Sequence, residues 1–320
     1  MTQKVTTVEI ETKTDTSNVQ AEISKAANKV TSDVTKAVLS TVLDTLEKRS
    51  NEILEHVNKV AKPREVAIAV KINDGELRKL KVAAHPLLPE VINMLAIGLT
   101  PLLVGPAGCG KTFLAEQAAE ALGLAYAHLC FSAGVSETWL FGRQTPQGFI
   151  EGEFSKLYKN GGLFLADEMD AADANLLLTI NTALANGHMY NPISGESIKR
   201  HKDFFFVGTA NTFGKGGNAV YTGRSRLDAA TLDRFTSLTV DYIKDVEDTI
   251  CPEKDVANWL REVRKKVAAK GSQEVISYRA FDKAYRLHKS GVEQAEIAKM
   301  LFASWPESTK QAVLAKDEWA

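Results

Sequence analysis

Short apolar runs alternate with amphipathic stretches between residues 86 and 240. The runs cover residues 101–104, 125–130, 163–166, 204–208 and 237–240. Such runs are typical of strands buried on both faces of a parallel sheet. Because the stretches between them have helical spacing, the pattern predicts an α/β fold in which a five-stranded parallel sheet lies between helices. We place this α/β domain at residues 85–243.

The flanking regions have different patterns. From residue 244 to residue 320 apolar positions recur at helical spacing, which predicts a small all-α domain. Residues 1–20 contain little that could be buried and predict a mobile arm. Residues 21–62 predict a long amphipathic helix, whose apolar stripe is a docking face or a coiled-coil seam. Residues 63–84 predict a β-hairpin that turns at Asn73-Asp74-Gly75.

Composition and charge restrict the class of protein. The 320 residues have a formal net charge of -1, so the basic excess usual in proteins that coat nucleic acid is missing. The most apolar stretch, residues 86–105, contains Glu90 and Asn93, which favours a helix and a buried strand over a membrane span. Three cysteines without CxxC spacing indicate reduced thiols. We therefore expect a protein of the cytoplasm, or of the host cytoplasm if its origin is viral.

A glycine-rich loop follows the first apolar run and precedes a helical stretch. Its sequence fits GxxxxGK[ST] in the strand–loop–helix context that a phosphate-binding loop requires. The glycines let backbone N–H groups surround phosphates, Lys111 would reach the β- and γ-phosphates, and the Thr112 hydroxyl would bind Mg²⁺. The predicted nucleotide-binding residues are Gly105, Pro106, Ala107, Gly108, Cys109, Gly110, Lys111, Thr112 and Phe113. Within this loop Pro106 and Cys109 are expected to have no chemical role.

Two later apolar runs end in polar residues. The run at residues 162–166 is followed by Asp167 and Glu168, and the run at residues 204–210 by Asn211. In a parallel sheet these strand ends face the ligand crevice. Asp167 would hold Mg²⁺, and Glu168 would polarise the attacking water. Asn211 would orient that water or contact the γ-phosphate, although an asparagine at a strand end is more often a turn residue.

The order of these motifs resembles that of AAA+ ATPases over residues 85–300. It continues with Leu232-Asp233-Arg234-Phe235 and Ser277-Tyr278-Arg279-Ala280, and within that superfamily it is most similar to the MoxR branch, which includes CobS-like, CbbQ-like and NorQ-like proteins. Three features support the branch. One is the Leu232–Phe235 ending after Asp228-Ala229-Ala230-Thr231. The others are residues 140–154, which resemble its helix-2 insertion, and residues 187–203, a hairpin with its turn at 193–197. The resemblance does not extend to residues 1–84.

The resemblance implies roles for several arginines. Arg279 would touch the γ-phosphate of its own subunit, and Arg234 would reach the nucleotide of a neighbouring subunit. Arg224 and Arg226 are further candidates for the contact across the interface. A bidentate cation stabilises the charge on a transferring phosphoryl group. The implied assembly is a hexameric ring that uses Mg-ATP hydrolysis to remodel a protein partner, such as one of von Willebrand factor A type.

Two other functions stay open at this stage. The same core drives nucleic-acid motors and loaders, for which Lys199, Arg200 and Lys202 would be the contacts. A nucleotide-dependent assembly scaffold is the second, which the intact Asp167-Glu168 pair disfavours. The partner contacts of a ring would be apolar residues of the two hairpins, unless these residues pack on the core. They are Phe141, Phe149, Ile150, Phe154, Met189 and Tyr190.

Overall fold

The computed structural model describes residues 85–217, 220–221 and 223–315. The chain divides into two units, Met1–Ala84 and His85–Ala320. The arm, helix and hairpin that the sequence predicts for residues 1–84 lie outside the described residues, so they remain predictions.

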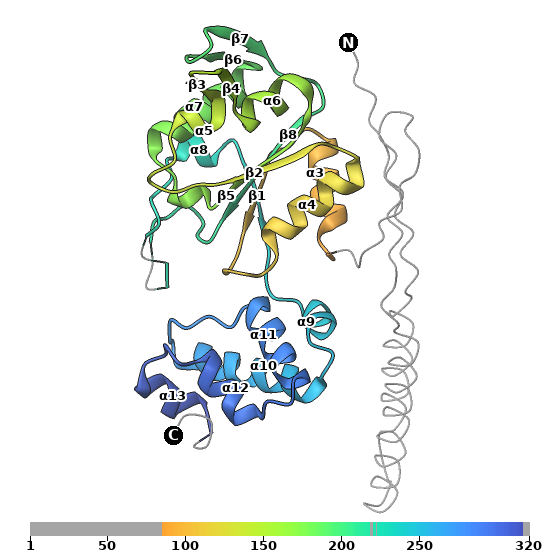
Figure 1. Ribbon diagram of the computed structural model, residues 1–320, viewed down its shortest axis with the longest axis vertical. Helices are drawn as coiled ribbons and strands as arrows, with labels where there is room; N and C mark the ends of the chain where they lie inside the picture. Colours follow the sequence, from red (N-terminus) through yellow and green to blue (C-terminus); the bar gives the residue numbers. More distant parts are fainter. Residues whose placement is uncertain (1–84, 218–219, 222, 316–320) are drawn as a thin grey trace, which may run out of the picture. The chain divides into compact units, whose positions relative to one another are not determined.

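A five-stranded parallel sheet forms the centre of the α/β part (Figure 1). Its strand order is β2-β5-β8-β1-β9. The three central strands are almost wholly buried, whereas the edge strands β2 and β9 are partly exposed. This confirms the fold and the five strands predicted from the apolar runs. The strands are β1 (Pro101–Val104), β2 (Tyr126–Cys130), β5 (Gly162–Asp167), β8 (Phe204–Ala210) and β9 (Thr236–Thr239).

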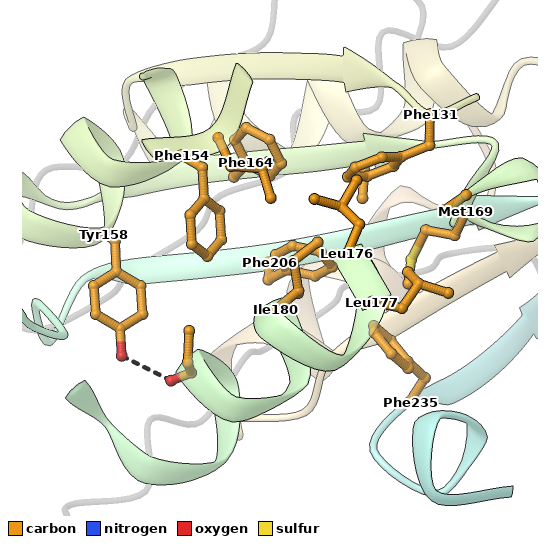
Figure 2. Packing of buried hydrophobic residues seen from close by; sticks show 14 of the residues in the cluster. Phe131, Phe154, Tyr158, Phe164, Met169, Leu176, Leu177, Ile180, Phe206 and Phe235 are labelled. Carbon is orange, nitrogen blue, oxygen red and sulfur yellow. Dashed lines mark hydrogen bonds between the residues drawn. The ribbon is translucent and has the colours of Figure 1, made fainter. Parts of the chain in front are cut away.

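Helices flank the sheet. The helix α3 (Leu88–Ala96) contacts α4 (Lys111–Leu122), and α4 contacts β5 and β8. The helices α6 (Glu153–Asn160) and α7 (Ala174–Asn186) pack on apolar side chains of the central strands, in the cluster drawn in Figure 2. Shorter helical segments complete this part. They are α5 (Glu137–Phe141), η1 (Met169–Ala171) and α8 (Ala229–Leu232).

The stretches at residues 140–154 and 187–203 each contain a β-hairpin. One pairs β3 (Gly142–Thr145) with β4 (Gly148–Glu151), and the other pairs β6 (His188–Asn191) with β7 (Glu196–Lys199). The buried side chain of Asn191 donates a hydrogen bond to the Phe141 carbonyl at 3.0 Å and joins the two regions. In the second hairpin region, Arg200 is half-buried, donates to the Phe204 carbonyl and lies over the Phe204 ring. Arg200 is therefore a packing residue, which weakens its assignment as a nucleic-acid contact.

The aromatic core lies between the sheet and α6. The Phe154 ring is fully buried and meets the rings of Phe164 and Phe204 edge-on, with centroids 5.2 and 5.7 Å apart. Phe141 is also fully buried, and Met189 is 4% exposed. Burial contradicts the partner-contact hypothesis for Phe141, Phe154 and Met189 and supports the packing alternative. It leaves Ile150 and Tyr190, which are 46% and 64% exposed, and the half-buried Phe149 as candidates.

The C-terminal part is helical, as predicted. A buried apolar cluster holds its helices together, and the buried carboxylate of Glu247 pairs with Arg261 and Arg264. None of the helices in the described residues is long and apolar enough to cross a membrane. The helices are α9 (Lys244–Ile250), α10 (Lys254–Ala269), α11 (Tyr278–Lys289), α12 (Gln294–Leu301) and α13 (Glu307–Val313).

Truncating the central aromatic ring tests this description of the core. We expect Phe154→Ala to lower the free energy of unfolding by about 3–5 kcal/mol, because a large side chain is removed from a packed site. Urea denaturation measures the change. The matched control is Tyr190→Ala, an aromatic truncation at an exposed site, for which we expect a change within about 0.5 kcal/mol. Equal effects of the two variants would contradict the packing.

Candidate functional site

The predicted site residues of three strands converge at one edge of the sheet. The strands β5, β8 and β1 are neighbours and run parallel, so their carboxyl ends lie side by side. The glycine-rich loop follows β1, Asp167 ends β5 and Asn211 follows β8. The first helix after the loop, α4, begins at Lys111.

Glycine is required in the loop by close backbone contacts. A Cβ atom at Gly105 would lie 1.8 Å from the carbonyl oxygen of Val240. Gly108 and Gly110 have φ values of 67° and 95°, in the left-handed region that favours glycine. Cys109 is fully buried, and its thiol lies 3.3 Å from the Val240 carbonyl, to which it donates. Burial raises the pKa of the Cys109 thiol. Cys109 therefore anchors the loop to the residue after β9, a role that the sequence did not indicate.

The side chain of Lys111, the first residue of α4, reaches back into the loop. Its ammonium group donates to the carbonyl oxygens of Gly105 and Pro106 at 2.7 and 2.9 Å and to Oδ1 of Asn211 at 2.8 Å. The residue is 7% exposed, and burial lowers the pKa of Lys111. The structure thus brings Lys111 and Asn211 into contact across two neighbouring strands, as the sequence predicted for one site.

Thr112 and Asp167 form an oxygen pair beside the loop. The Thr112 hydroxyl donates to Oδ2 of Asp167 at 3.0 Å, and the Thr209 hydroxyl donates to the other carboxylate oxygen. One carboxylate and one hydroxyl suit Mg²⁺, which prefers oxygen ligands and in such sites takes further ligands from phosphates. The described residues contain no cluster of three or more acidic, histidine or cysteine side chains that could hold a metal ion by themselves. The pair therefore fits a magnesium ion that is shared with a bound phosphate.

Glu168 has an unusual backbone. Its φ and ψ are 58° and 42°, and among the described residues it alone has a positive φ without being glycine. Its backbone N–H donates to the Thr209 hydroxyl at 2.9 Å, which holds this conformation. Non-glycine residues in the left-handed region are uncommon and cluster at functional sites. The left-handed conformation turns the chain at Glu168, so the side chains of Asp167 and Glu168 contact different residues.

A family comparison agrees with this geometry. Residues 101–235 match the model of the AAA domain of the dynein-related subfamily. The fold of these residues is therefore that of an AAA domain. The match includes the glycine-rich loop, the acidic pair and Asn211, and it supports a nucleotide-binding ATPase in general. No curated protein matches the chain significantly.

Asp170 belongs to the site, although no motif in the sequence marks it. It is fully buried, and its Oδ2 accepts hydrogen bonds from the backbone N–H groups of Asn211 and Thr212 and from the Thr212 hydroxyl, at 2.9 to 3.1 Å. Asp170 therefore fixes the start of the segment that carries Asn211. The available signal is an aspartate two residues after Glu168, but Asp170 lies beyond the end of β5 and belongs to no recognisable motif.

The three candidate trans arginines have different surroundings. The Arg224 side chain is 13% exposed and lies 3.2 Å from Oε2 of Glu168 and 3.3 Å from Oδ1 of Asp170. Its charge is therefore engaged within its own chain. Arg226 is exposed, with a backbone bridge to Lys215. Arg234 is exposed at the end of α8 and donates to the Ala230 carbonyl.

Arg279 lies beside the phosphate loop. Its Cγ is 4.0 Å from where a Cβ of Gly108 would be, and the side chain is exposed. The preceding residue, Tyr278, connects α11 to the loop, because its backbone N–H donates to the Gly108 carbonyl at 3.2 Å. The structure thus brings Arg279 to the loop, and its contact with a γ-phosphate stays a prediction.

Tyrosines hold the loop in ways that the sequence did not reveal. The Tyr221 hydroxyl accepts from the Ala107 N–H at 2.9 Å, and the Tyr242 hydroxyl donates to the Ala107 carbonyl at 2.8 Å. The Arg264 guanidinium lies 4.0 Å above the Tyr242 ring, and burial raises the pKa of Tyr242. No motif marks these contacts, because they join residues more than 110 positions apart.

Adding one methyl group at Gly105 tests how tightly the loop is packed. We expect Gly105→Ala to lower the free energy of unfolding by about 1–3 kcal/mol, because the added carbon overlaps the Val240 carbonyl. Thermal and urea denaturation measure the change.

Gly134→Ala is the matched control. It adds the same methyl group at an exposed glycine with nothing within 4 Å of the new carbon, so we expect a change within about 0.5 kcal/mol. Stability of Gly105→Ala equal to that of the control would show that the loop tolerates a side chain there.

Proposed function

We propose that this protein is an AAA+ ATPase of the MoxR type that assembles into a hexameric ring and uses Mg-ATP hydrolysis to remodel a protein partner. The observation that supports hydrolysis is the convergence of Lys111, Thr112, Asp167, Glu168 and Asn211 at one edge of the sheet. AAA+ proteins typically form oligomeric rings, and the two hairpins supply exposed apolar side chains for partner contact. We propose the cytoplasm as its location, since all three cysteines are free.

Each converging residue has a role in the proposed reaction. The ammonium group of Lys111 binds the β- and γ-phosphates, to which the backbone N–H groups of the loop also donate. Thr112 and Asp167 hold Mg²⁺, which neutralises developing charge on the phosphates when bound. Glu168 polarises the attacking water, and the side-chain amide of Asn211 orients it.

Two arginines complete the proposed site. Arg279 would contact the γ-phosphate from its own subunit, which its place beside Gly108 supports. Arg234 would reach the nucleotide of the neighbouring subunit. Support for Arg234 comes from its exposure, since a trans finger must be free to leave its own chain. Arg226 is exposed too and is the remaining rival.

Removing the charge of Glu168 tests the hydrolytic role. We expect Glu168→Gln to bind ATP as the wild type does but to hydrolyse it at least about 100-fold more slowly, because the amide cannot accept a proton from water. Phosphate release and binding of a fluorescent ATP analogue measure the two steps. The control is Glu262→Gln on the exposed face of α10, for which turnover should be unchanged. Normal hydrolysis by Glu168→Gln would exclude this role.

Mixing inactive subunits tests the role of Arg234. We expect Arg234→Ala and Lys111→Ala to be inactive separately, since a trans arginine contributes about 10³-fold or more to turnover. Mixed rings should recover part of the activity, because an intact nucleotide site then faces an intact Arg234. Arg286→Ala, at a side chain that is 76% exposed, controls for loss of an arginine and should stay active. Mixed rings without recovery would argue against Arg234.

A further inference from the structure

We propose that Arg224 is a positioning residue that acts within its own subunit and holds the carboxylate of Glu168 in place for the attacking water. The inference rests on the proposed ATP hydrolysis. It assigns to Arg224 a different task from the contact across the subunit interface that the sequence suggested.

The side chain of Glu168 needs an external support. Its backbone is held by Thr209, but its side chain is 40% exposed. The Nη1 atom of Arg224 donates to Oε2 of Glu168 at 3.2 Å. Burial raises the pKa of the Cys130 thiol on β2, and the nearby charge of Glu168 raises it further. Among the described residues, Arg224 thus supplies a cationic contact to Glu168.

Arg224 is itself anchored to a rigid part of the site. The same Nη1 atom lies 3.3 Å from Oδ1 of Asp170, a fully buried carboxylate oxygen that has no hydrogen bond among the described residues. The backbone N–H of Ser225 donates to the Asp170 carbonyl at 2.6 Å. Since a buried carboxylate needs a compensating charge, Asp170 holds the guanidinium at this place.

Asp170 links this arrangement to Asn211. Its second carboxylate oxygen accepts the backbone N–H groups of Asn211 and Thr212. One nitrogen atom of Arg224 therefore contacts both Glu168, which would polarise the water, and Asp170. Asp170 in turn holds the backbone of Asn211, which would orient the water. Both groups must hold their geometry at the same time, which a shared support achieves.

The low exposure of Arg224 disfavours a contact with a neighbouring subunit. Its side chain is 13% exposed, and two carboxylates of its own chain compensate its charge. Reaching a neighbour would require leaving Asp170 with an uncompensated buried charge, which is unfavourable. Arg226 and Arg234, which are exposed, meet no such barrier.

Subunit mixing separates a cis role from a trans role. We expect Arg224→Ala to lower kcat at least about 10-fold with KM changed less than about 2-fold, because positioning of Glu168 acts on the chemical step. Mixing Arg224→Ala with Lys111→Ala should restore no activity, since every site then carries a defect of its own subunit. The mixture of Arg234→Ala with Lys111→Ala, tested in parallel, shows whether subunits exchange. Recovery in the Arg224 mixture, or a rise in kcat, would overturn the proposal.

A double-mutant cycle shows whether Arg224 acts through Glu168. In single-turnover reactions, Arg224→Ala should slow the Glu168→Gln enzyme less than about 2-fold, because the carboxylate that it positions is gone. Arg224→Lys should retain more activity than Arg224→Ala, since its ammonium group can still reach one carboxylate. Equal slowing in both backgrounds would indicate a role independent of Glu168 and overturn the proposal.

Two controls keep the outcome clear. If Arg224→Ala unfolds because Asp170 loses its partner, Arg224→Gln replaces it, since the amide can still donate to Asp170; thermal melting identifies this case. Wild-type protein that hydrolyses no ATP would overturn the proposed function and this inference together. Wild-type turnover with recovery in the Arg224 mixture would overturn this inference alone.

Discussion

The parallel pairing of β5, β8 and β1 is the constraint on which the site depends. Leu165 is opposite Val207, and Gly208 is opposite Leu102, so the three strands end at the same edge of the sheet. Parallel strands require crossover helices, which cover the faces and leave the carboxyl ends accessible. The apolar side chains that bury these strands thereby decide where Lys111, Asp167 and Asn211 meet.

A buried carboxylate then connects the strand ends. Asp170 is fully buried and interacts with the β8 end through backbone N–H groups and with Arg224 through charge. In a medium of low dielectric constant such a network is stable only when its members are satisfied together. This makes the conformations of Glu168, Asn211 and Arg224 interdependent. It explains why Arg224, 56 positions after Glu168, contributes to a site at the end of β5.

Residues that follow β9 and residues of the helical part contact the phosphate loop and set its geometry. The carbonyl oxygen of Val240 accepts a hydrogen bond from the Cys109 thiol and leaves no room for a side chain at Gly105. The helical part contributes the N–H of Tyr278, and Tyr242 contributes its hydroxyl group. The loop carbonyls at Ala107 and Gly108 therefore have their partners in the segment that follows the sheet. Its geometry depends on the helical part as well as on the glycine pattern.

The sequence by itself determined the α/β fold, the five strands and the residues of the phosphate loop, because apolar period and glycine spacing are local properties that need no partner. It also predicted that Asp167, Glu168 and Asn211 lie near Lys111, since parallel strand ends share an edge. It could not distinguish Arg224 from Arg226 and Arg234, or show that Asp170 joins them. Those outcomes depend on which side chains become buried beside which charges, and burial between residues far apart in sequence is decided only when the chain has folded.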